Sequence, residues 1–268
     1  MPETYQIIYM LFVFAFGLCF GSFLNVVIYR LPRKLSLSHP PSRCPSCEVR
    51  LGVIELIPLI GYLILRGRCR HCSAVISMRY PVVELLTGLL FLLLFNLLGL
   101  NLNFLFYLIL LYLLLAIALI DLEHRIVPNT LVAAGLIAAA LLFLPQLFAL
   151  WLPFNSELIV DRAFLDGLAG LLLGGGVMLI IFLVSRGGMG AGDIKLMAMI
   201  GLYVGLRGAA LVMLLGFFLG ALVGVAGMIF GKLTRKDALP FAPYLVMATL
   251  LEVLWGETIW NWYMNLLQ

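Results

Sequence analysis

The sequence predicts an all-α polytopic membrane protein of about eight transmembrane helices, with a small cytoplasmic zinc-binding insertion after the first helix. Three observations support this fold class. Hydrophobic residues make up 64% of the 268 and charged residues 11%, whereas a soluble domain is nearer half apolar and a quarter charged. Apolar runs close to the ~20 residues that cross a bilayer recur along the chain. Two C-x-x-C pairs stand in the first long polar connection.

Eight apolar runs define the expected spans. All but the sixth approach the length of a membrane helix. The first has no basic residue before it and no clear cleavage site after it, so we interpret it as an uncleaved helix. We expect a first transmembrane helix over 1–28, a cytoplasmic zinc-binding loop domain over 29–80 and a seven-helix membrane domain over 81–268. The runs cover residues 5–28, 81–98, 104–120, 130–151, 164–184, 194–206, 209–230 and 241–260.

The basic residues predict the orientation. Together with Lys195, the connections 29–80, 121–129, 185–193 and 231–240 hold 15 of the 17 Lys and Arg residues. The positive-inside rule therefore places these connections in the cytoplasm and the N-terminus outside. The net charge of +4 could suggest binding to nucleic acid, but this segregation argues against it. It favours contact of the basic residues with lipid head groups.

Two acids stand at the ends of apolar runs on the predicted cytoplasmic side. Asp121 ends the third run and Asp193 opens the sixth. An acid in a membrane segment is costly and suggests function, although either one alone would also fit an ordinary helix end in the solvated interface. Gly190, Gly192 and Lys195 flank Asp193, and we expect them to support an active-site loop. The preceding glycines allow a tight turn there.

A pair of close carboxylates is suited to aspartic peptide hydrolysis, because like charges share one proton. The ionised member takes a proton from water and the protonated member polarises the scissile carbonyl. Asp193 stands at a helix N-terminus, which favours the charged form, and Asp121 at a C-terminus, which disfavours it. We therefore hypothesise that Asp193 is the base and that Asp121 carries the shared proton.

The cysteines predict a structural metal site. Cys44, Cys47, Cys69 and Cys72 form two C-x-x-C pairs at a spacing typical of four-thiolate zinc. Disulfides are the alternative, and the reducing cytoplasm disfavours them. A closed zinc site stabilises a fold and leaves no open position for catalysis. Cys19, in the first apolar run, is expected to be a packing residue.

Other segments have structural interpretations. Residues 53–65 are apolar but too short to span, so we expect them along the membrane surface or beneath the zinc site. Gly174, Gly175 and Gly176, and separately the four-residue repeat of Gly216, Gly220 and Gly224, indicate close helix packing.

In this order, the motifs resemble those of the type IV prepilin peptidases, a group of GxGD aspartic proteases. The resemblance runs almost end to end, through residues 21–32, both cysteine pairs, 79–85, 120–129, 190–195 and 240–244. It implies that Asp121 and Asp193 are the catalytic pair. It also implies cleavage after a short basic leader on prepilin or pseudopilin substrates at the bacterial inner membrane. Glu123 and Ala242 depart slightly from the residues common in that family.

The resemblance further implies N-methylation of the new N-terminal residue with S-adenosylmethionine. No soluble dinucleotide-type motif locates the methyl donor. Acids that might meet a basic leader are Glu48, Glu55, Glu84, Glu123 and Asp237.

Two other classes remain open from the sequence. A transporter could use the Asp pair as a proton relay, although it would favour acids near the bilayer midplane. A membrane-anchored zinc assembly module would need the cysteines but neither aspartate. Cleavage of a prepilin-like peptide separates all three.

Overall fold

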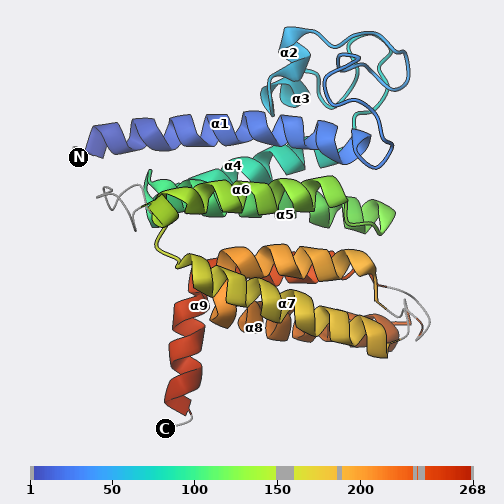
Figure 1. The fold of residues 1–268 in the computed structure, drawn as a ribbon. Helices are drawn as coiled ribbons and strands as arrows, with labels where there is room; N and C mark the ends of the chain where they lie inside the picture. The colour runs from blue at the N-terminus through green and yellow to red at the C-terminus, as the bar shows by residue number, and fades with distance from the viewer. Residues whose placement is uncertain (1–2, 149–159, 186–188, 232–233, 235–238, 267–268) are drawn as a thin grey trace. The chain divides into compact units, whose positions relative to one another are not determined.

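The computed structural model describes residues 3–148, 160–185, 189–231, 234 and 239–266. Helices account for all regular elements in these ranges, and the only strand-like pairings are two isolated bridges, Arg43 with Arg50 and Arg68 with Val75. The helices are α1 (Glu3–Arg30), α2 (Val53–Leu56), α3 (Ile60–Ile64), α4 (Arg79–Leu98), α5 (Leu102–His124), α6 (Asn129–Phe148), α7 (Phe164–Val184), α8 (Ala191–Ile229) and α9 (Ala242–Leu266) (Figure 1). The predicted all-α class is confirmed.

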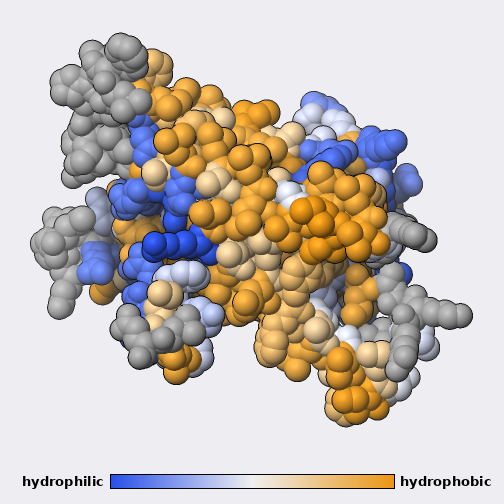
Figure 2. All heavy atoms as spheres, turned by 60° about the horizontal axis from the view of Figure 1, so that its bottom comes forward, coloured by the Kyte–Doolittle hydropathy of each residue, from blue (hydrophilic) through white to orange (hydrophobic). Residues whose placement is uncertain are grey.

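Six of the described helices are long and apolar enough to cross a membrane: α1, α4, α5, α6, α7 and α8. Apolar side chains accordingly cover much of the face in Figure 2. The chain is a multi-pass membrane protein. The expected sixth and seventh spans are the two parts of α8, which breaks at Gly205 with φ of 72°, a value that favours glycine. The expected eighth span corresponds to α9, which is not among the six.

The chain divides into two compact units, Met1–Leu100 and Asn101–Gln268, hereafter unit 1 and unit 2. Unit 1 contains α1 to α4, so α4 groups with the cysteine-bearing segment. Its two long helices approach closely, because a Cβ on Gly21 would lie only 2.6 Å from Glu84 Cα. The short helices are joined to α4, since the Leu59 N–H donates to Glu84 Oε2 at 2.8 Å.

Unit 2 contains α5 to α9 around a core of large side chains. Tyr203 of α8 is fully buried, and its hydroxyl donates to the Gly135 carbonyl of α6 at 2.8 Å. The centroid of its ring lies 4.4 Å from that of Phe106 of α5. Small residues bring the helices together, as the glycine pattern indicated. A Cβ on Gly174 would lie 2.9 Å from the Met197 carbonyl, and one on Gly216 2.9 Å from Leu245.

Not every predicted packing residue behaves in this way. Gly176 has open space where a Cβ would stand, so that part of the glycine interpretation is wrong. Cys19 is exposed on α1 rather than packed inside the protein. In a membrane helix such positions face lipid as readily as protein, and periodicity alone does not distinguish the two.

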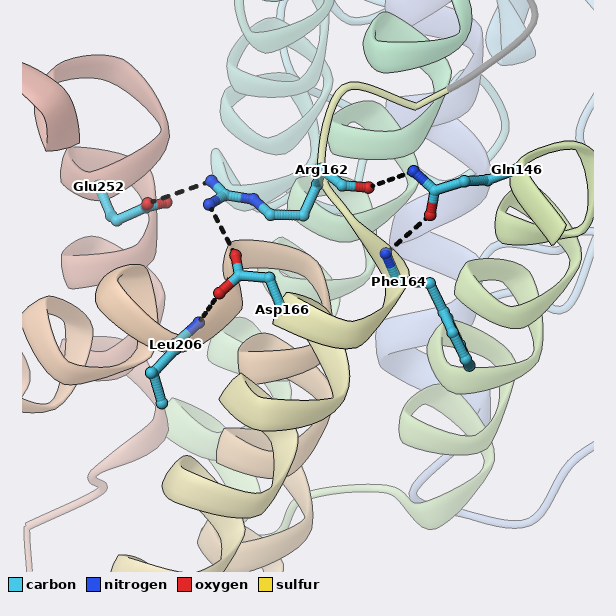
Figure 3. Close-up of polar contacts among 6 residues, drawn as sticks. All are labelled: Gln146, Arg162, Phe164, Asp166, Leu206 and Glu252. Atoms are coloured by element: carbon cyan, nitrogen blue, oxygen red, sulfur yellow. Dashed lines mark hydrogen bonds and ion pairs between the residues drawn. The ribbon is translucent and has the colours of Figure 1, made fainter. Parts of the chain in front are cut away.

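A polar network closes one end of unit 2, where the segment 160–163 enters α7 (Figure 3). We call it the arginine end. Arg162 donates to Asp166 Oδ2 at 3.3 Å and lies 3.9 Å from Glu252 Oε1 of α9. The other oxygen of Asp166 accepts the Leu206 N–H at 3.1 Å, directly after the break at Gly205. Asp166 thus caps the second part of α8 from a neighbouring helix.

Further hydrogen bonds attach the same segment to α5 and α6. Asn103 and Asp161 bond to each other twice, at 2.7 and 3.0 Å. Gln146 donates to the Arg162 carbonyl at 3.1 Å and accepts the Phe164 N–H at 2.7 Å (Figure 3). One short segment therefore contacts all five helices of unit 2.

Candidate active site and metal centre

Asp121 lies in the last turn of α5, at the end of unit 2 opposite Arg162. The helix ends there because Arg125 adopts a left-handed conformation, with φ of 54°, and its N–H bonds to the Asp121 carbonyl at 2.8 Å. The Asp121 side chain is only 5% exposed. The α5 terminus therefore holds a carboxyl group inside the protein rather than in the solvated interface.

Asp193 lies in the first turn of α8 and is 8% exposed. Gly192 allows this turn to lie against the segment that follows α5, since a Cβ there would be 2.8 Å from Val127 Cβ. Lys195 donates to Asn129 Oδ1, the first residue of α6, at 3.1 Å. Gly192 and Lys195 thus attach the start of α8 to the connection between α5 and α6.

Gly190 contributes through its backbone, which hydrogen-bonds to the Asp193 carboxylate, rather than through its lack of a side chain. It is the N-cap of α8, with φ of −72°, a value that any residue adopts. A Cβ on Gly190 would meet Asp193 Oδ2 at 3.4 Å, an ordinary contact. The tight turn expected earlier in this stretch involves Gly187 and Gly188, which lie outside the described residues.

The two carboxyl groups come together at the aspartate end, which we define by Asp121, Asp193 and Ala242. The charge of Asp121 acts on Asp193, and among the described residues neither carboxylate forms an ion pair. Two buried acids that interact in this way are costly to ionise together.

Sequence reasoning missed the role of Ala242 as a hydrogen-bond donor. Its backbone N–H, in the first turn of α9, donates to Asp121 Oδ2 at 3.2 Å. The only sequence signal for this contact is the segment 240–244, which belongs to the family pattern. Because Pro243 has no N–H, the Ala242 N–H is one of few free donors in that turn.

This hydrogen bond bears on which aspartate holds the proton. Ala242 and the charge of nearby Arg125 both favour negative charge on Asp121. Asp193 accepts a backbone hydrogen bond in the same way, from Gly190, and its position at a helix N-terminus also favours negative charge. The two effects oppose each other, so the hypothesis that Asp193 is the base loses its support from helix ends alone.

The structure describes four of the five other acids named from the sequence. Glu48, Glu55 and Glu84 belong to unit 1. Glu123 lies 3.9 Å from His124 Nε2, and Asp237 is outside the described residues.

The four cysteines of unit 1 form a cluster that could hold a metal ion. Their Sγ atoms all lie within 4.8 Å of one another, and those of Cys44 and Cys72 are 3.8 Å apart. A tetrahedral zinc with Zn–S bonds near 2.3 Å separates its sulfurs by about 3.8 Å. The cluster therefore fits zinc, as the spacing predicted.

The two halves of the cluster share one backbone design. The Cys44 N–H bonds to the Val49 carbonyl at 3.0 Å, and the equivalent Cys69 N–H bonds to Ala74 at 2.8 Å. Glu48 and Ser73, each following the second cysteine of its pair, both have positive φ, 58° and 55°. Each pair thus forms a tight turn around its sulfurs.

The same turns supply donors to the first sulfur of each pair. Backbone N–H groups of Cys47 and Ser46 lower the pKa of the Cys44 thiol to about 6. Those of Cys72 and His71 lower the pKa of Cys69. Because thiolates are the metal-binding form, the first cysteine of each pair is the readier ligand, whereas burial and the neighbouring thiols raise the pKa of Cys47 and Cys72.

Comparison with known proteins agrees with the division into units. Residues 15–98 match the family model described as the bacterial peptidase A24 N-terminal domain, and residues 108–225 match that of the type IV leader peptidase family. The first match lies within unit 1 and the second within unit 2. No solved structure matches the chain.

Curated relatives cover nearly the whole chain. A protein of Aeromonas salmonicida is 34% identical over 96% of this chain and 94% of its own length. One of Bacillus subtilis is 33% identical over 95% and 97%, and one of Legionella pneumophila 32% over 93% and 92%. All three are named prepilin leader peptidase/N-methyltransferase.

Proposed function

Because the chain belongs to the type IV leader peptidase family, we propose that it is a membrane aspartic endopeptidase that removes the leader from prepilins and pseudopilins and then N-methylates the new N-terminus. The observation that carries the peptidase activity is the meeting of Asp121 and Asp193, both buried, at one end of unit 2. The printed names of the relatives support both activities.

The geometry suits hydrolysis of a peptide bond. One carboxylate takes a proton from a water molecule, whose oxygen attacks the scissile carbonyl carbon. The other carboxyl group, protonated, donates to the carbonyl oxygen and stabilises its developing negative charge. The carboxyl group that donated to the carbonyl oxygen then transfers its proton to the leaving nitrogen, and the C–N bond breaks. The Ala242 N–H holds Asp121 Oδ2 in place throughout.

The orientation follows from the basic residues. The protein lies in the bacterial inner membrane. Because 15 of the 17 Lys and Arg residues lie in or beside four connections, these connections face the cytoplasm and the N-terminus lies outside. Both aspartates then stand at the cytoplasmic boundary of the bilayer. A substrate with a polar leader and an apolar helix would present its cleavage site at that depth.

The cysteine cluster has a structural role in this proposal. Cys44, Cys47, Cys69 and Cys72 would hold zinc in a closed tetrahedral site within unit 1. Such a site stabilises the surrounding turns and takes no part in peptide hydrolysis. S-adenosylmethionine would supply the methyl group for the second activity.

One assay tests the proposal. Purified protein in lipid nanodiscs is incubated with a prepilin-like peptide and labelled methyl donor, and the cleaved bond and methylated product are mapped. We expect Asp121→Asn and Asp193→Asn each to abolish cleavage while retaining zinc. Cleavage at the wild-type rate in both variants would refute the peptidase, and cleavage without methylation in the wild type would refute the second activity.

A further inference from the structure

Glu84 is a buried acid in unit 1 that peptide hydrolysis does not use. It is 8% exposed, although it belongs to a membrane-spanning helix. Its Oε2 accepts the Leu59 N–H at 2.8 Å, and the Ser22 side chain also bonds to it. Among the described residues no cationic side chain pairs with it. A carboxylate in this setting lacks a counter-charge.

Asn25 of α1 adds an acceptor without a donor. It is 2% exposed, and its amide Nδ2 donates to the carbonyls of Tyr80, at 3.1 Å, and Gly21, at 3.3 Å. Its Oδ1 is buried and has no hydrogen-bond partner in the described structure. Gly21 lies against Glu84 and Tyr80 is one turn before it, so Asn25 is about one helical turn from Glu84.

Glu55 of α2 supplies another orphaned oxygen. Its Oε2 accepts the Gly52 N–H at 2.5 Å, whereas Oε1 is buried without a partner among the described residues. Helix α2 leads directly into the turn whose Leu59 N–H is bound by Glu84. Asn25, Glu55 and Glu84 thus offer acceptors from α1, α2 and α4 in one region of unit 1, and two of the three are carboxyl groups.

Such a set calls for a ligand that is positively charged and rich in donors. Buried acceptors left unpaired are rare because their desolvation is not repaid. A primary ammonium offers three N–H donors and no acceptor, which matches three acceptors. A sulfonium centre offers no donor of its own. The acceptors therefore fit an ammonium group, which both a peptide amino terminus and the methionine part of the methyl donor carry, rather than the sulfonium.

We propose that Glu84, with Asn25 and Glu55, binds the free amino terminus of the cleaved peptide as the methyl acceptor. This inference rests on the methylation half of the proposed function. Glu84 accepts a proton from the bound ammonium, and the neutral amine nitrogen attacks the methyl carbon of S-adenosylmethionine. The new N–C bond forms as the C–S bond breaks, and its electron pair returns to sulfur, leaving a neutral thioether. The proton on Glu84 then passes to water.

The experiment compares two mature-sequence peptides, one with a free amino terminus and one N-acetylated, binding to full-length protein in nanodiscs. Loss of a charge-assisted hydrogen bond reduces affinity about 10–100-fold. We expect the wild type to prefer the free amine by about that factor. We expect Glu84→Gln to lose the preference and nearly all methylation, with cleavage and zinc content unchanged. Glu257→Gln, an exposed acid of α9, is the matched control and should behave as wild type.

Four outcomes would overturn the proposal. In Glu84→Gln they are methylation at the wild-type rate, an unchanged preference for the free amine, or a loss confined to the binding of S-adenosylmethionine. The fourth is the same losses in Glu257→Gln. If Glu84→Gln loses zinc or cleavage, Glu55→Gln decides, and unaltered methylation there also refutes the site. A wild type that cleaves without methylating refutes the second activity instead, and the peptide preference then judges the amine site alone.

Discussion

The two ends of unit 2 treat buried charge in opposite ways. At the arginine end, Arg162 lies between two acids, Asp166 and Glu252, and each charge has a partner (Figure 3). At the aspartate end, two buried acids, Asp121 and Asp193, interact electrostatically, and no described cation forms an ion pair with either. Helices α5, α8 and α9 contribute to both ends.

This difference separates stability from chemistry. A compensated network fixes the positions of the helices, since opposite charges and shared hydrogen bonds favour one arrangement. An uncompensated pair of acids costs stability and keeps a proton available for transfer. The arginine end thus fixes the positions of helices that also contribute to the aspartate end. Removing a charge should therefore have opposite consequences at the two ends.

The largest expected effect is on catalysis at the aspartate end. Asp193→Asn removes one member of a unit that shares a proton, so we expect cleavage to fall by about 10⁴-fold or more. The thermal unfolding temperature should stay the same or rise, because the repulsion between two buried acids is gone. Single-turnover cleavage and thermal unfolding in nanodiscs measure both quantities.

Asp166→Asn is the matched change at the arginine end. The amide oxygen still accepts the Leu206 N–H, so α8 keeps its cap while Arg162 loses one charge partner. We expect cleavage within about threefold of wild type, since a partly exposed pair contributes about 1 kcal/mol and Arg162 keeps Glu252 as its other partner. A loss of cleavage comparable to that of Asp193→Asn would contradict the division between the two ends.

The next effect concerns stability at the arginine end. Arg162→Met leaves Glu252, which is 9% exposed, as a buried acid without its cation. Breaking such a pair from one side costs about 3–5 kcal/mol. We therefore expect a strong decrease in the free energy of unfolding of unit 2, measured by denaturant titration.

Two further variants check that explanation. Adding Glu252→Gln to Arg162→Met should recover most of the lost stability, because no charge is then left unpaired at that position. Arg207→Met removes an exposed arginine near the Trp260 ring and should change stability by less than about 1 kcal/mol. No recovery in the double variant would show that Arg162 acts through packing rather than charge.

A smaller effect should follow from a change of shape at the aspartate end. Gly192→Ala places a methyl group 2.8 Å from Val127 Cβ, which pushes the first turn of α8 away from α5. Small displacements of catalytic groups are costly, and we expect cleavage to fall by about 10–100-fold. Val127→Gly in the same chain should restore part of the rate. Gly176→Ala, which meets open space, should leave the rate unchanged.

The sequence predicted those features that depend on composition and local pattern. Long apolar runs mark the spans, and the two C-x-x-C pairs mark a cluster whose sulfurs meet within 4.8 Å. Asp121 and Asp193 could be paired because the basic residues predict that the connections beside them lie on the same side of the membrane. Each of these inferences depends only on the spacing of residues along the sequence and on the predicted membrane side of each connection.

The sequence could not predict contacts made by backbone atoms or by residues far apart in the chain. The Ala242 N–H reaches Asp121 across 121 positions, and nothing in its side chain indicates a donor. Arg162 and Glu252 are 90 positions apart, and each alone resembles a residue at a solvated helix end. Their pairing depends on how the helices pack, which periodicity does not specify in a membrane.

The smallest expected effect tests a contact at the aspartate end that contains no ion pair. Lys195 donates to Asn129 Oδ1 at 3.1 Å and both side chains are exposed, so the bond contributes little to the free energy of unfolding. Lys195→Met should reduce cleavage about two- to fivefold, because the start of α8 loses one of its attachments. Asn129→Ala should do the same, and the double variant should be no worse than either single one. Strictly additive losses would show that Lys195 acts on the substrate directly, and the aspartate end would then contain a cation that serves catalysis rather than one that only positions α8.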